Sequence, residues 1–285
     1  EPPVDLLFNT IMLEPNRWTP DHTLNWPLTD LLGPIDEAGF RKLELWGYHV
    51  DRIDDAEVAN LVEGLAARSM CALGVGAYPS FHKEGAEDED EIARLERIAS
   101  VSAALGARIF KVFPGRVASA SADEALWTRT VERLRALCDL VGRDGMTLTL
   151  ETHGGTLCDT LDNTLRLLDR LADRDNIGIC FQPYTEHDTD EAIAAFDALG
   201  DRVRHLHVQN RSAEGTMTLL EEGDWTDYRR FLSHAKAVGF DGALCIEFTA
   251  GIVPAEGETF DPSRVLENAG LDRRFIDAVW SAPEH

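Results

Sequence analysis

The sequence predicts an α/β fold, a single (β/α)8 TIM barrel that spans residues 1–285 as one domain. Short apolar runs alternate with longer amphipathic segments along the chain, which is typical of a parallel sheet with helical crossovers. Eight such repeats occur, and that number favours a closed barrel. No linker, low-complexity tract or change of composition divides the chain.

The expected strands and helices follow one another in alternation. Strands are expected at 5–10, 42–46, 71–76, 108–113, 147–151, 177–182, 203–208 and 243–248. Helices are expected at 28–38, 56–68, 88–105, 121–143, 160–173, 190–199, 224–238 and 262–279. Several helices end in a glycine just before the next strand, which suits a C-cap and a short loop. The loops after the strands are longer and richer in aromatic and polar residues, so we expect the functional site at the carboxyl ends of the strands.

The composition excludes some classes of partner. The chain has 27 Lys and Arg against 51 Asp and Glu, a formal net charge of -24, and this charge repels nucleic-acid phosphates and anionic membranes. No apolar run approaches the roughly 20 residues needed to cross a bilayer, and the first residues do not resemble a signal peptide. The five cysteines are widely spaced and include no CxxC pair. We therefore expect a soluble cytoplasmic protein with reduced cysteines.

Polar side chains lie at the ends of the last four predicted strands. A barrel brings these strand ends around one mouth, although they are far apart in the sequence. Two carboxylates, one imidazole and one amide oxygen suit a single divalent metal ion, with Mn²⁺ as the first choice and Mg²⁺ or Co²⁺ as alternatives. The four predicted ligands are Glu151, Gln182, His207 and Glu247.

The competing interpretation is structural. In that case the two glutamates form buried salt bridges with Arg204 or His205, and His207 is a core histidine whose hydrogen bonds are satisfied. Four polar residues at four successive strand ends favour the metal site over this interpretation.

Two further residues are candidates for chemistry at the same mouth. His153 lies two residues after Glu151, on the same side of the strand, where it could exchange a proton with the substrate. The alternative is a loop histidine that only hydrogen-bonds a neighbouring carboxylate. Lys111, near the end of the 108–113 strand, could contact a substrate oxygen, or it could pair inside the barrel with Glu44 or Glu151.

Aromatic and polar residues in the loops suggest a carbohydrate pocket. The wall would contain Trp46, His49, Tyr78, His82 and Phe181, although aromatics near a barrel mouth are often core residues. Gln209 and Arg211, which follow His207, are further candidates for substrate binding, and Gln209 is a rival metal ligand to Gln182.

Several motifs resemble those of the xylose isomerase-like TIM-barrel superfamily. They are LELW at 43–46, LETHGGTLCDT at 150–160, HLHVQN at 205–210, EEGDWTDYRRFL at 221–232 and GFDGALCIEF at 239–248. This superfamily contains sugar isomerases, epimerases, dehydratases and lyases of 3-keto-glycosides. The resemblance implies metal ligands at Glu151, Gln182, His207 and Glu247, with Glu151 and Glu247 also exchanging protons with the substrate.

The chain departs from the superfamily pattern at two places. Gln182 stands where an aspartate is usual, which leaves a bound ion more positive and more weakly held. Leu157, Thr185 and Ala213 stand where ketohexose epimerases carry glutamate, histidine and arginine. The second departure argues against a simple ketohexose epimerase.

The expected function is metal-dependent proton abstraction next to a carbonyl in a sugar or keto-sugar, by an isomerase or epimerase. A lyase of the same superfamily, either a dehydratase or a 3-keto-glycoside or C-glycoside deglycosidase, is the alternative. A non-catalytic sugar-binding or partner subunit is a further alternative. Expected partners are a small carbohydrate substrate and either a second copy of the chain or a small accessory subunit.

Overall fold

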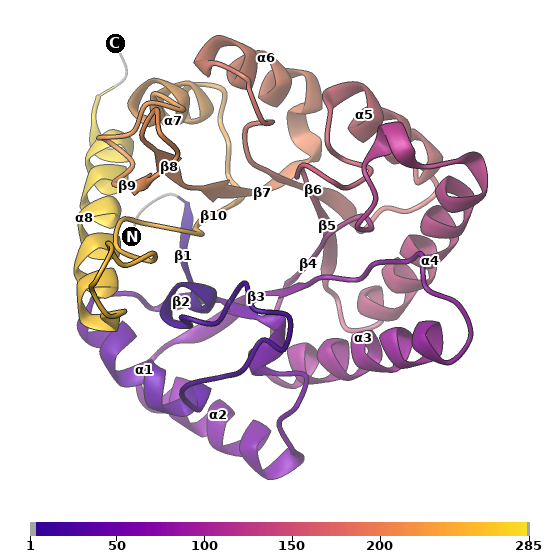
Figure 1. Ribbon diagram of the computed structural model, residues 1–285, viewed down its shortest axis with the longest axis horizontal. Coiled ribbons are helices and arrows are strands. Elements are labelled where there is room, and N and C mark those ends of the chain that lie inside the picture. The colour runs from indigo at the N-terminus through magenta and orange to yellow at the C-terminus, as the bar shows by residue number, and fades with distance from the viewer. Residues whose placement is uncertain (1–3, 284–285) are drawn as a thin grey trace.

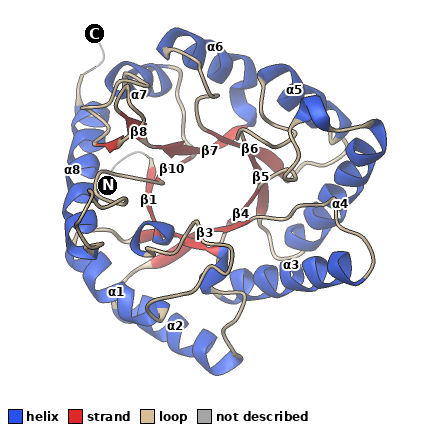
Figure 2. Cartoon of the chain, in the orientation of Figure 1, coloured by secondary structure: helices blue, strands red, loops and turns tan. Residues whose placement is uncertain are grey.

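The computed structural model describes residues 4–283 and contains a closed barrel of parallel strands inside a ring of helices (Figure 1). The order of strands around the barrel is β1-β10-β7-β6-β5-β4-β3-β2. Strand β1 pairs with both β10 and β2, which closes the sheet. In Figure 2 the red strands form the inner ring and the blue helices cover their outer faces. The predicted (β/α)8 barrel is therefore confirmed.

The eight predicted strands all form, with ends that differ from the prediction by at most two residues. The barrel strands are β1 (Asp5–Asn9), β2 (Lys42–Trp46), β3 (Cys71–Ala77), β4 (Ile109–Val112), β5 (Thr147–Glu151), β6 (Ile177–Phe181), β7 (Val203–Val208) and β10 (Ala243–Ile246). A small antiparallel hairpin, β8 (Asn210–Arg211) and β9 (Met217–Thr218), follows β7 and was not predicted.

The eight predicted helices also form around the barrel. They are α1 (Leu28–Glu37), α2 (Asp55–Ala67), α3 (Ala86–Ala104), α4 (Glu124–Gly142), α5 (Leu161–Arg170), α6 (Thr189–Leu199), α7 (Tyr228–Ala237) and α8 (Pro262–Ser281). Short 3-10 turns add η1 (Thr10–Leu13), η2 (Gly47–His49), η3 (Ser119–Ser121) and η4 (Gly200–Arg202). None of the described helices has the length and apolar character that a membrane span requires.

The start of α7 differs most from the prediction. The helix was expected from residue 224, but it begins at Tyr228 because the side chain of Asp227 caps it by accepting a hydrogen bond from the Arg230 amide. The preceding residues belong instead to the loop of the hairpin, where the amides of Asp224 and Trp225 both donate to the carbonyl of Arg211. The helix is shortened because these residues hold the hairpin in place.

The interior of the barrel is divided into an apolar layer and a polar layer. Leu7, Leu73, Ile109, Ala243 and Cys245 form a small apolar cluster inside the sheet, separate from the larger core between sheet and helices. Further along the strands, toward their carboxyl ends, the buried side chains become polar or charged. This change places ionisable groups at one end of a packed barrel, where their interactions are little screened by water.

Candidate functional site

Three of the predicted metal ligands meet at the carboxyl end of the barrel. Glu151 ends β5, His207 lies near the end of β7, and Glu247 directly follows β10. His207 Nδ1 lies 3.7 Å from Glu151 Oε1 and 3.5 Å from Glu247 Oε1. All three side chains are buried. Their atoms lie close enough together to hold one metal ion.

The chemistry of these donors fits a divalent cation. His207 Nδ1 is buried and has no hydrogen-bond partner among the described residues, yet two carboxylate oxygens face it. Burial by itself would raise the pKa of Glu247, but the charge of His207 holds that pKa below its ordinary value. Two carboxylate oxygens and an imidazole nitrogen whose proton a metal ion can replace form an open set of ligands of the kind that Mg²⁺, Mn²⁺ or Co²⁺ prefer.

Glu44 on β2 supports His207 from the opposite side of its ring. His207 Nε2 lies 3.1 and 2.9 Å from the two carboxylate oxygens of Glu44, and Asn9 donates a further hydrogen bond to the same carboxylate. Burial by itself would raise the pKa of Glu44, but His207 and His205 hold that pKa well below its ordinary value. A proton on Nε2 of His207, shared with Glu44, leaves Nδ1 free to bind a metal.

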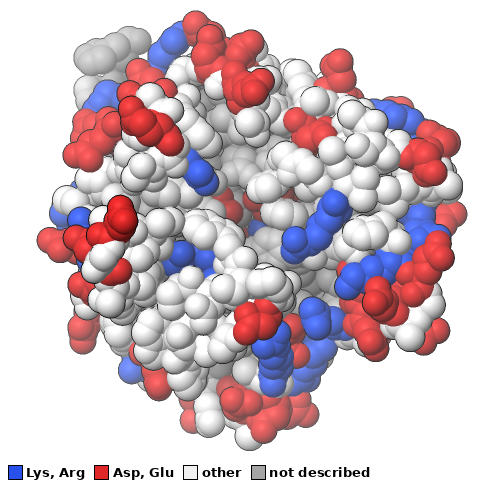
Figure 3. Space-filling model, viewed as in Figure 1, with Lys and Arg blue, Asp and Glu red and all other residues white. Residues whose placement is uncertain are grey.

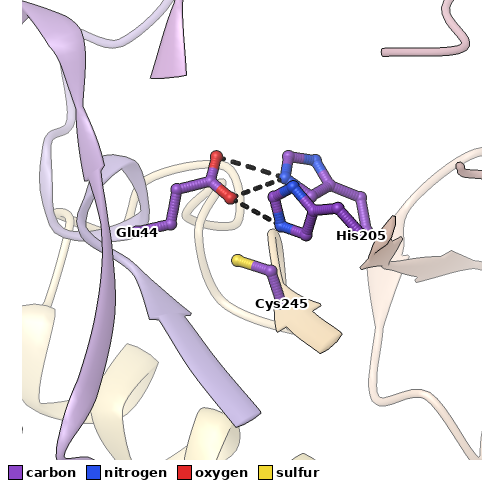
Figure 4. A group of neighbouring side chains, drawn as sticks. Glu44, His205 and Cys245 are labelled. Atoms are coloured by element: carbon purple, nitrogen blue, oxygen red, sulfur yellow. Dashed lines mark hydrogen bonds and ion pairs between the residues drawn. The ribbon is translucent and has the colours of Figure 1, made fainter. Parts of the chain in front are cut away.

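A second group of potential metal ligands lies deeper in the barrel. Glu44, His205, His207 and Cys245 are all buried, and Figure 4 shows Glu44 and His205 facing each other with the Cys245 sulfur nearby. His205 Nε2 lies 2.9 Å from Glu44 Oε2. The imidazole of His207 belongs to both groups, one nitrogen to each. The inner group therefore orients His207, while the outer group faces the mouth of the barrel.

Lys111 on β4 pairs with the metal-ligand candidate Glu151. Its Nζ is 2.5 Å from Glu151 Oε2 and 4.0 Å from Glu44 Oε1, and the side chain is fully buried. Burial by itself would lower the pKa of Lys111, but the charge of Glu151 raises it well above its ordinary value. Gly76 makes room for this lysine, because a Cβ there would lie 2.9 Å from Lys111 Cε. The pairing inside the barrel, one of the two predicted alternatives, is what the structure contains.

Gln182 and Gln209 form a hydrogen-bonded chain beside the ligands. Gln182 Nε2 donates to Glu151 Oε1 at 3.0 Å and to the Thr152 carbonyl at 2.9 Å. Gln182 Oε1 accepts from Gln209 Nε2, which also donates to Glu247 Oε2 at 2.8 Å. The side of the Gln182 amide that faces Glu151 must be its nitrogen, because Glu151 Oε1 and the Thr152 carbonyl on that side are both acceptors. Coordination of a metal by Gln182 remains a prediction and requires its amide to turn.

A cavity of about 590 Å³ opens beside this chain, at the carboxyl ends of β5, β6 and β7. The catalytic candidate His153 and the substrate-binding candidates Gln209 and Arg211 contribute to its walls, and their roles there remain predictions. His153 is exposed, and its Nδ1 lies 2.6 Å from the Gly154 carbonyl, which fixes a proton on Nδ1. Nε2 of His153 is then the nitrogen with a free lone pair.

The predicted aromatic wall is only partly at the mouth. Trp46 and His49 are buried, and the two ring nitrogens of His49 lie 2.9 Å from Thr10 Oγ1 and 3.1 Å from Glu14 Oε1. No ring nitrogen of His49 is left for a sugar hydroxyl. His82 is exposed and contacts the Ser80 carbonyl.

Tyr78 and Phe181, the remaining members of that wall, also pack against protein. The Lys111 Nζ lies 4.4 Å from the centre of the Tyr78 ring. Phe181 stacks on Phe231 of α7 in the core. The cavity at the carboxyl ends of β5 to β7 instead presents Trp225 and His187, which the sequence interpretation did not select.

Sequence reasoning also missed the importance of Glu44, which it weighed only as a partner of Lys111. A detectable signal was present, because Glu44 is a charged residue inside the apolar β2 strand LELW. The free-energy cost of burying an unpaired carboxylate at this position would exceed the stability that the strand gains from burial. Several buried partners of Glu44 were therefore to be expected. The partners come from β1 and β7 and could not be identified from local sequence.

Comparisons with known proteins agree with this architecture. A curated 3-dehydroshikimate dehydratase from Bacillus anthracis is 27% identical over 197 residues, which cover 68% of this chain and 70% of the relative. The solved D-psicose 3-epimerase of Clostridium cellulolyticum H10 superposes with a TM-score of 0.75 at 13% identity, covering 98% of this chain and 100% of that one. A xylose isomerase-like TIM barrel protein from Mycobacterium smegmatis, solved with magnesium, has a TM-score of 0.72 at 18% identity and covers 98% and 97%.

The family model described as xylose isomerase-like TIM barrel matches residues 34–269. This match covers most of the chain, and two of these relatives, the dehydratase and the epimerase, are enzymes. The chain is therefore an enzyme that belongs to the xylose isomerase-like TIM-barrel family.

Proposed function

We propose that this enzyme removes the proton next to the carbonyl group of a sugar-derived ketone and then expels a β-hydroxyl group as water. It would thus be a metal-dependent dehydratase, with isomerisation or epimerisation as the second candidate. The observation that carries this preference is the ion pair between Lys111 and Glu151, together with the bond from His153 Nδ1 to the Gly154 carbonyl that leaves His153 Nε2 without a proton. The sequence alone favours the isomerase, whereas the ion pair at Glu151 supports the dehydratase.

The ion pair matters because the two reactions need different numbers of bases. Epimerisation removes a proton from one face of a carbon and returns one to the opposite face, so it needs a group on each side. Glu151 is poorly suited to accept a proton, because Lys111 occupies Oε2 and the Gln182 amide occupies Oε1. An elimination needs one base, which can afterwards protonate the leaving group.

His153 is suited to that role. Its Nδ1 is held by the Gly154 carbonyl, its ring packs 4.5 Å from the Phe113 ring, and its side chain borders the cavity of about 590 Å³. A neutral imidazole whose Nδ1 carries the proton offers the lone pair of Nε2 as a proton acceptor. Packing against Phe113 limits the motion of the ring and keeps Nε2 in one region of the cavity.

The proposed reaction balances without an external reagent. His153 Nε2 takes the proton from the carbon next to the carbonyl, and the electrons of that C–H bond form a carbon–carbon double bond. The bond from the β-carbon to its hydroxyl group breaks, and the protonated His153 returns the proton to this oxygen, which leaves as water. The products are an unsaturated ketone, water and His153 in its starting state.

Glu151, His207 and Glu247 would hold the divalent ion, assisted by Gln182 if its amide turns. Bound there, the ion would supply positive charge beside the substrate carbonyl oxygen, which lowers the cost of the negative charge that develops during proton removal. Within the protein, Glu44 fixes the orientation of His207, and Lys111 offsets part of the negative charge of the carboxylates. Mn²⁺ remains the first choice for the native ion.

Epimerisation is the second candidate because two glutamates, Glu151 and Glu247, could carry protons on opposite sides of a substrate. Glu151 and Glu247 approach His207 Nδ1 from two different strands, as a pair of opposed proton carriers would require. If a substrate displaced Lys111 from Glu151, both carboxylates could take part in proton transfer. The comparison with the D-psicose 3-epimerase fold is compatible with this alternative.

Turnover of a panel of keto-sugars, 3-keto-glycosides and polyhydroxylated cyclic ketones in D₂O tests the proposal. We expect release of water with formation of an ultraviolet-absorbing unsaturated ketone, and deuterium in any substrate that is recovered after partial reaction. His153→Asn should lower kcat by about 10²-fold or more, the usual scale for loss of a general base, while metal content stays unchanged. His234→Asn on α7, whose imidazole pairs with Asp197, is the matched control and should keep full activity.

Other results would point elsewhere. A new epimer without an unsaturated product would favour the second candidate. Complete retention of the original hydrogen would indicate a hydride shift and remove His153 from the mechanism.

A further inference from the structure

We propose that Arg211 recognises an anionic group on the substrate, so that the enzyme acts on acidic or phosphorylated keto-sugars rather than on neutral ones. This inference rests on the proposed function and names the substrate class for that site. Arg211 lies in the β8–β9 hairpin directly after β7, and it borders the cavity that contains His153. It also borders a neighbouring cavity of about 1060 Å³, so it stands between the two.

The guanidinium group of Arg211 lacks strong acceptors. Its Nε is buried without a hydrogen-bond partner, and its two Nη atoms reach the Gly215 carbonyl and Gln209 Oε1 only at 3.5 Å. That distance is at the outer limit of a hydrogen bond. Among residues 4–283 no carboxylate lies within 4.0 Å of this guanidinium. A group with five N–H donors and a fixed positive charge is therefore largely unsatisfied.

The acidic composition makes this lack of a partner informative. The chain has 51 acidic residues against 27 basic ones, and Arg264, which borders the larger cavity, does pair with Glu258 at 3.2 Å. Asp224 follows in the same hairpin region, but its carboxylate accepts a hydrogen bond from the Ala213 amide instead. The Asp224 carboxylate, which could have neutralised Arg211, thus holds the backbone at Ala213.

Arg211 is also held in position. Its guanidinium carbon lies 4.9 Å from the centre of the Trp225 ring, a cation–π contact that leaves the edge of the guanidinium available. Asn210 fixes the hairpin by accepting a hydrogen bond from the Arg211 amide and donating to the Leu220 and Thr226 carbonyls. A flat, supported guanidinium is well suited to bind the planar oxygens of a carboxylate or the oxygens of a phosphate.

A single side chain connects Arg211 to the predicted metal ligands. Gln209 accepts the weak hydrogen bond from Arg211 and donates to Glu247 Oε2 at 2.8 Å. An anion bound to Arg211 therefore lies one side chain away from the reacting centre, within the span of one small substrate. Figure 3 shows Lys and Arg side chains near the central hollow of this face, whereas most acidic side chains lie toward its periphery.

The charge of the whole protein adds a reason for such a residue. A net charge of -24 repels an anionic substrate at long range, and a local positive group at the mouth offsets this repulsion where the anion binds. A neutral sugar would need no free guanidinium there. The shared chemistry is an oxyanion, and carboxylate and phosphate are its two possible sources.

Binding of three sugar probes to the full protein tests this assignment without turnover. The probes are D-glucose, D-glucuronate and D-glucose 6-phosphate, titrated at low salt with saturation-transfer NMR as the readout. We expect at least one of the two anionic sugars to bind 10-fold or more tightly than glucose, and the one that does so identifies carboxylate or phosphate. Arg211→Gln should remove this preference, Arg211→Lys should keep part of it, and Arg264→Gln should leave it unchanged.

Equal binding of all three probes, or a preference that survives in Arg211→Gln, would overturn the assignment. His153→Asn separates this result from the proposed reaction, because that variant should keep the preference for the anion while losing turnover. A protein that shows the preference but exchanges no proton would refute the dehydratase and leave the role of Arg211 intact.

Discussion

Replacing Glu44 with glutamine should weaken metal binding, although Glu44 is not itself expected to contact the ion at the outer site. In the wild-type protein both oxygens of Glu44 lie within 3.1 Å of His207 Nε2. Their negative charge favours a proton on Nε2 and raises the basicity of Nδ1, which faces Glu151 and Glu247. Glutamine keeps the shape and one acceptor oxygen but removes the charge.

The expected size of the effect follows from this geometry. Loss of a carboxylate partner of a metal-binding histidine typically costs 10- to 100-fold in metal affinity, which corresponds to roughly 1.4 to 2.7 kcal/mol. The upper part of the range applies best, because Glu44 is fully buried and both of its oxygens contact the imidazole. Isothermal titration with Mn²⁺ after removal of metal by a chelator measures the change.

Glu14→Gln is the matched control for this experiment. Glu14 is also a buried carboxylate that contacts a histidine, with 3.1 Å between its Oε1 and His49 Nε2, but neither residue belongs to the metal-ligand groups. Its replacement should leave Mn²⁺ affinity unchanged. Equal affinities of wild type and Glu44→Gln, or an equal loss in both variants, would refute the role assigned to Glu44.

Two further predictions concern metal affinity and pH. Gln182→Asp should tighten Mn²⁺ binding and lower turnover, because it adds a negative charge beside the ion; unchanged affinity in titration would mean that Gln209 or water fills that position. Burial raises the pKa of Asp272 from its ordinary value of 3.8 to about 7, so the folded protein binds more protons than the unfolded chain between these values. The contribution of Asp272 to stability is therefore complete below pH 3.8 and is lost as the pH rises through about 7, a loss on the order of 4 kcal/mol. Asp272→Asn can still accept from the Leu220 amide and donate to Thr249, so urea unfolding at pH 8 should find it more stable than wild type, and an equal or lower stability would argue against the buried protonated form.

Much of the barrel could be predicted from sequence because its signals are local. Short apolar runs, amphipathic segments and glycine C-caps each act within one element, and they identified all eight strands and helices. The hairpin after β7 gave no such signal. Its two strands have two residues each, and it is held by Asn210, whose partners Leu220 and Thr226 lie 10 and 16 residues away.

The sequence could predict which residues lie together at the site, because the carboxyl ends of the strands determine their positions. Glu151, His207 and Glu247 meet because parallel strands share one carboxyl end, and that rule needs no knowledge of side-chain contacts. The orientation of Gln182 and the saturation of both nitrogens of His49 depend on neighbours from other elements, namely Thr152 and the residues of η1 and its following loop. Such contacts decide the chemistry of a residue and cannot be inferred from its position along the chain.

Metal content tests the central claim most directly, because the proposed function places a divalent ion among Glu151, His207 and Glu247. Elemental analysis of protein purified without chelator should find close to one divalent ion per chain, and addition of Mn²⁺ should restore any ion that was lost. Glu247→Gln removes one of the two predicted anionic ligands and should lower this occupancy strongly under the same conditions. A wild-type protein that contains no stoichiometric metal, and that neither binds nor is activated by Mn²⁺, Mg²⁺ or Co²⁺, would contradict the metal site and the reaction proposed for it.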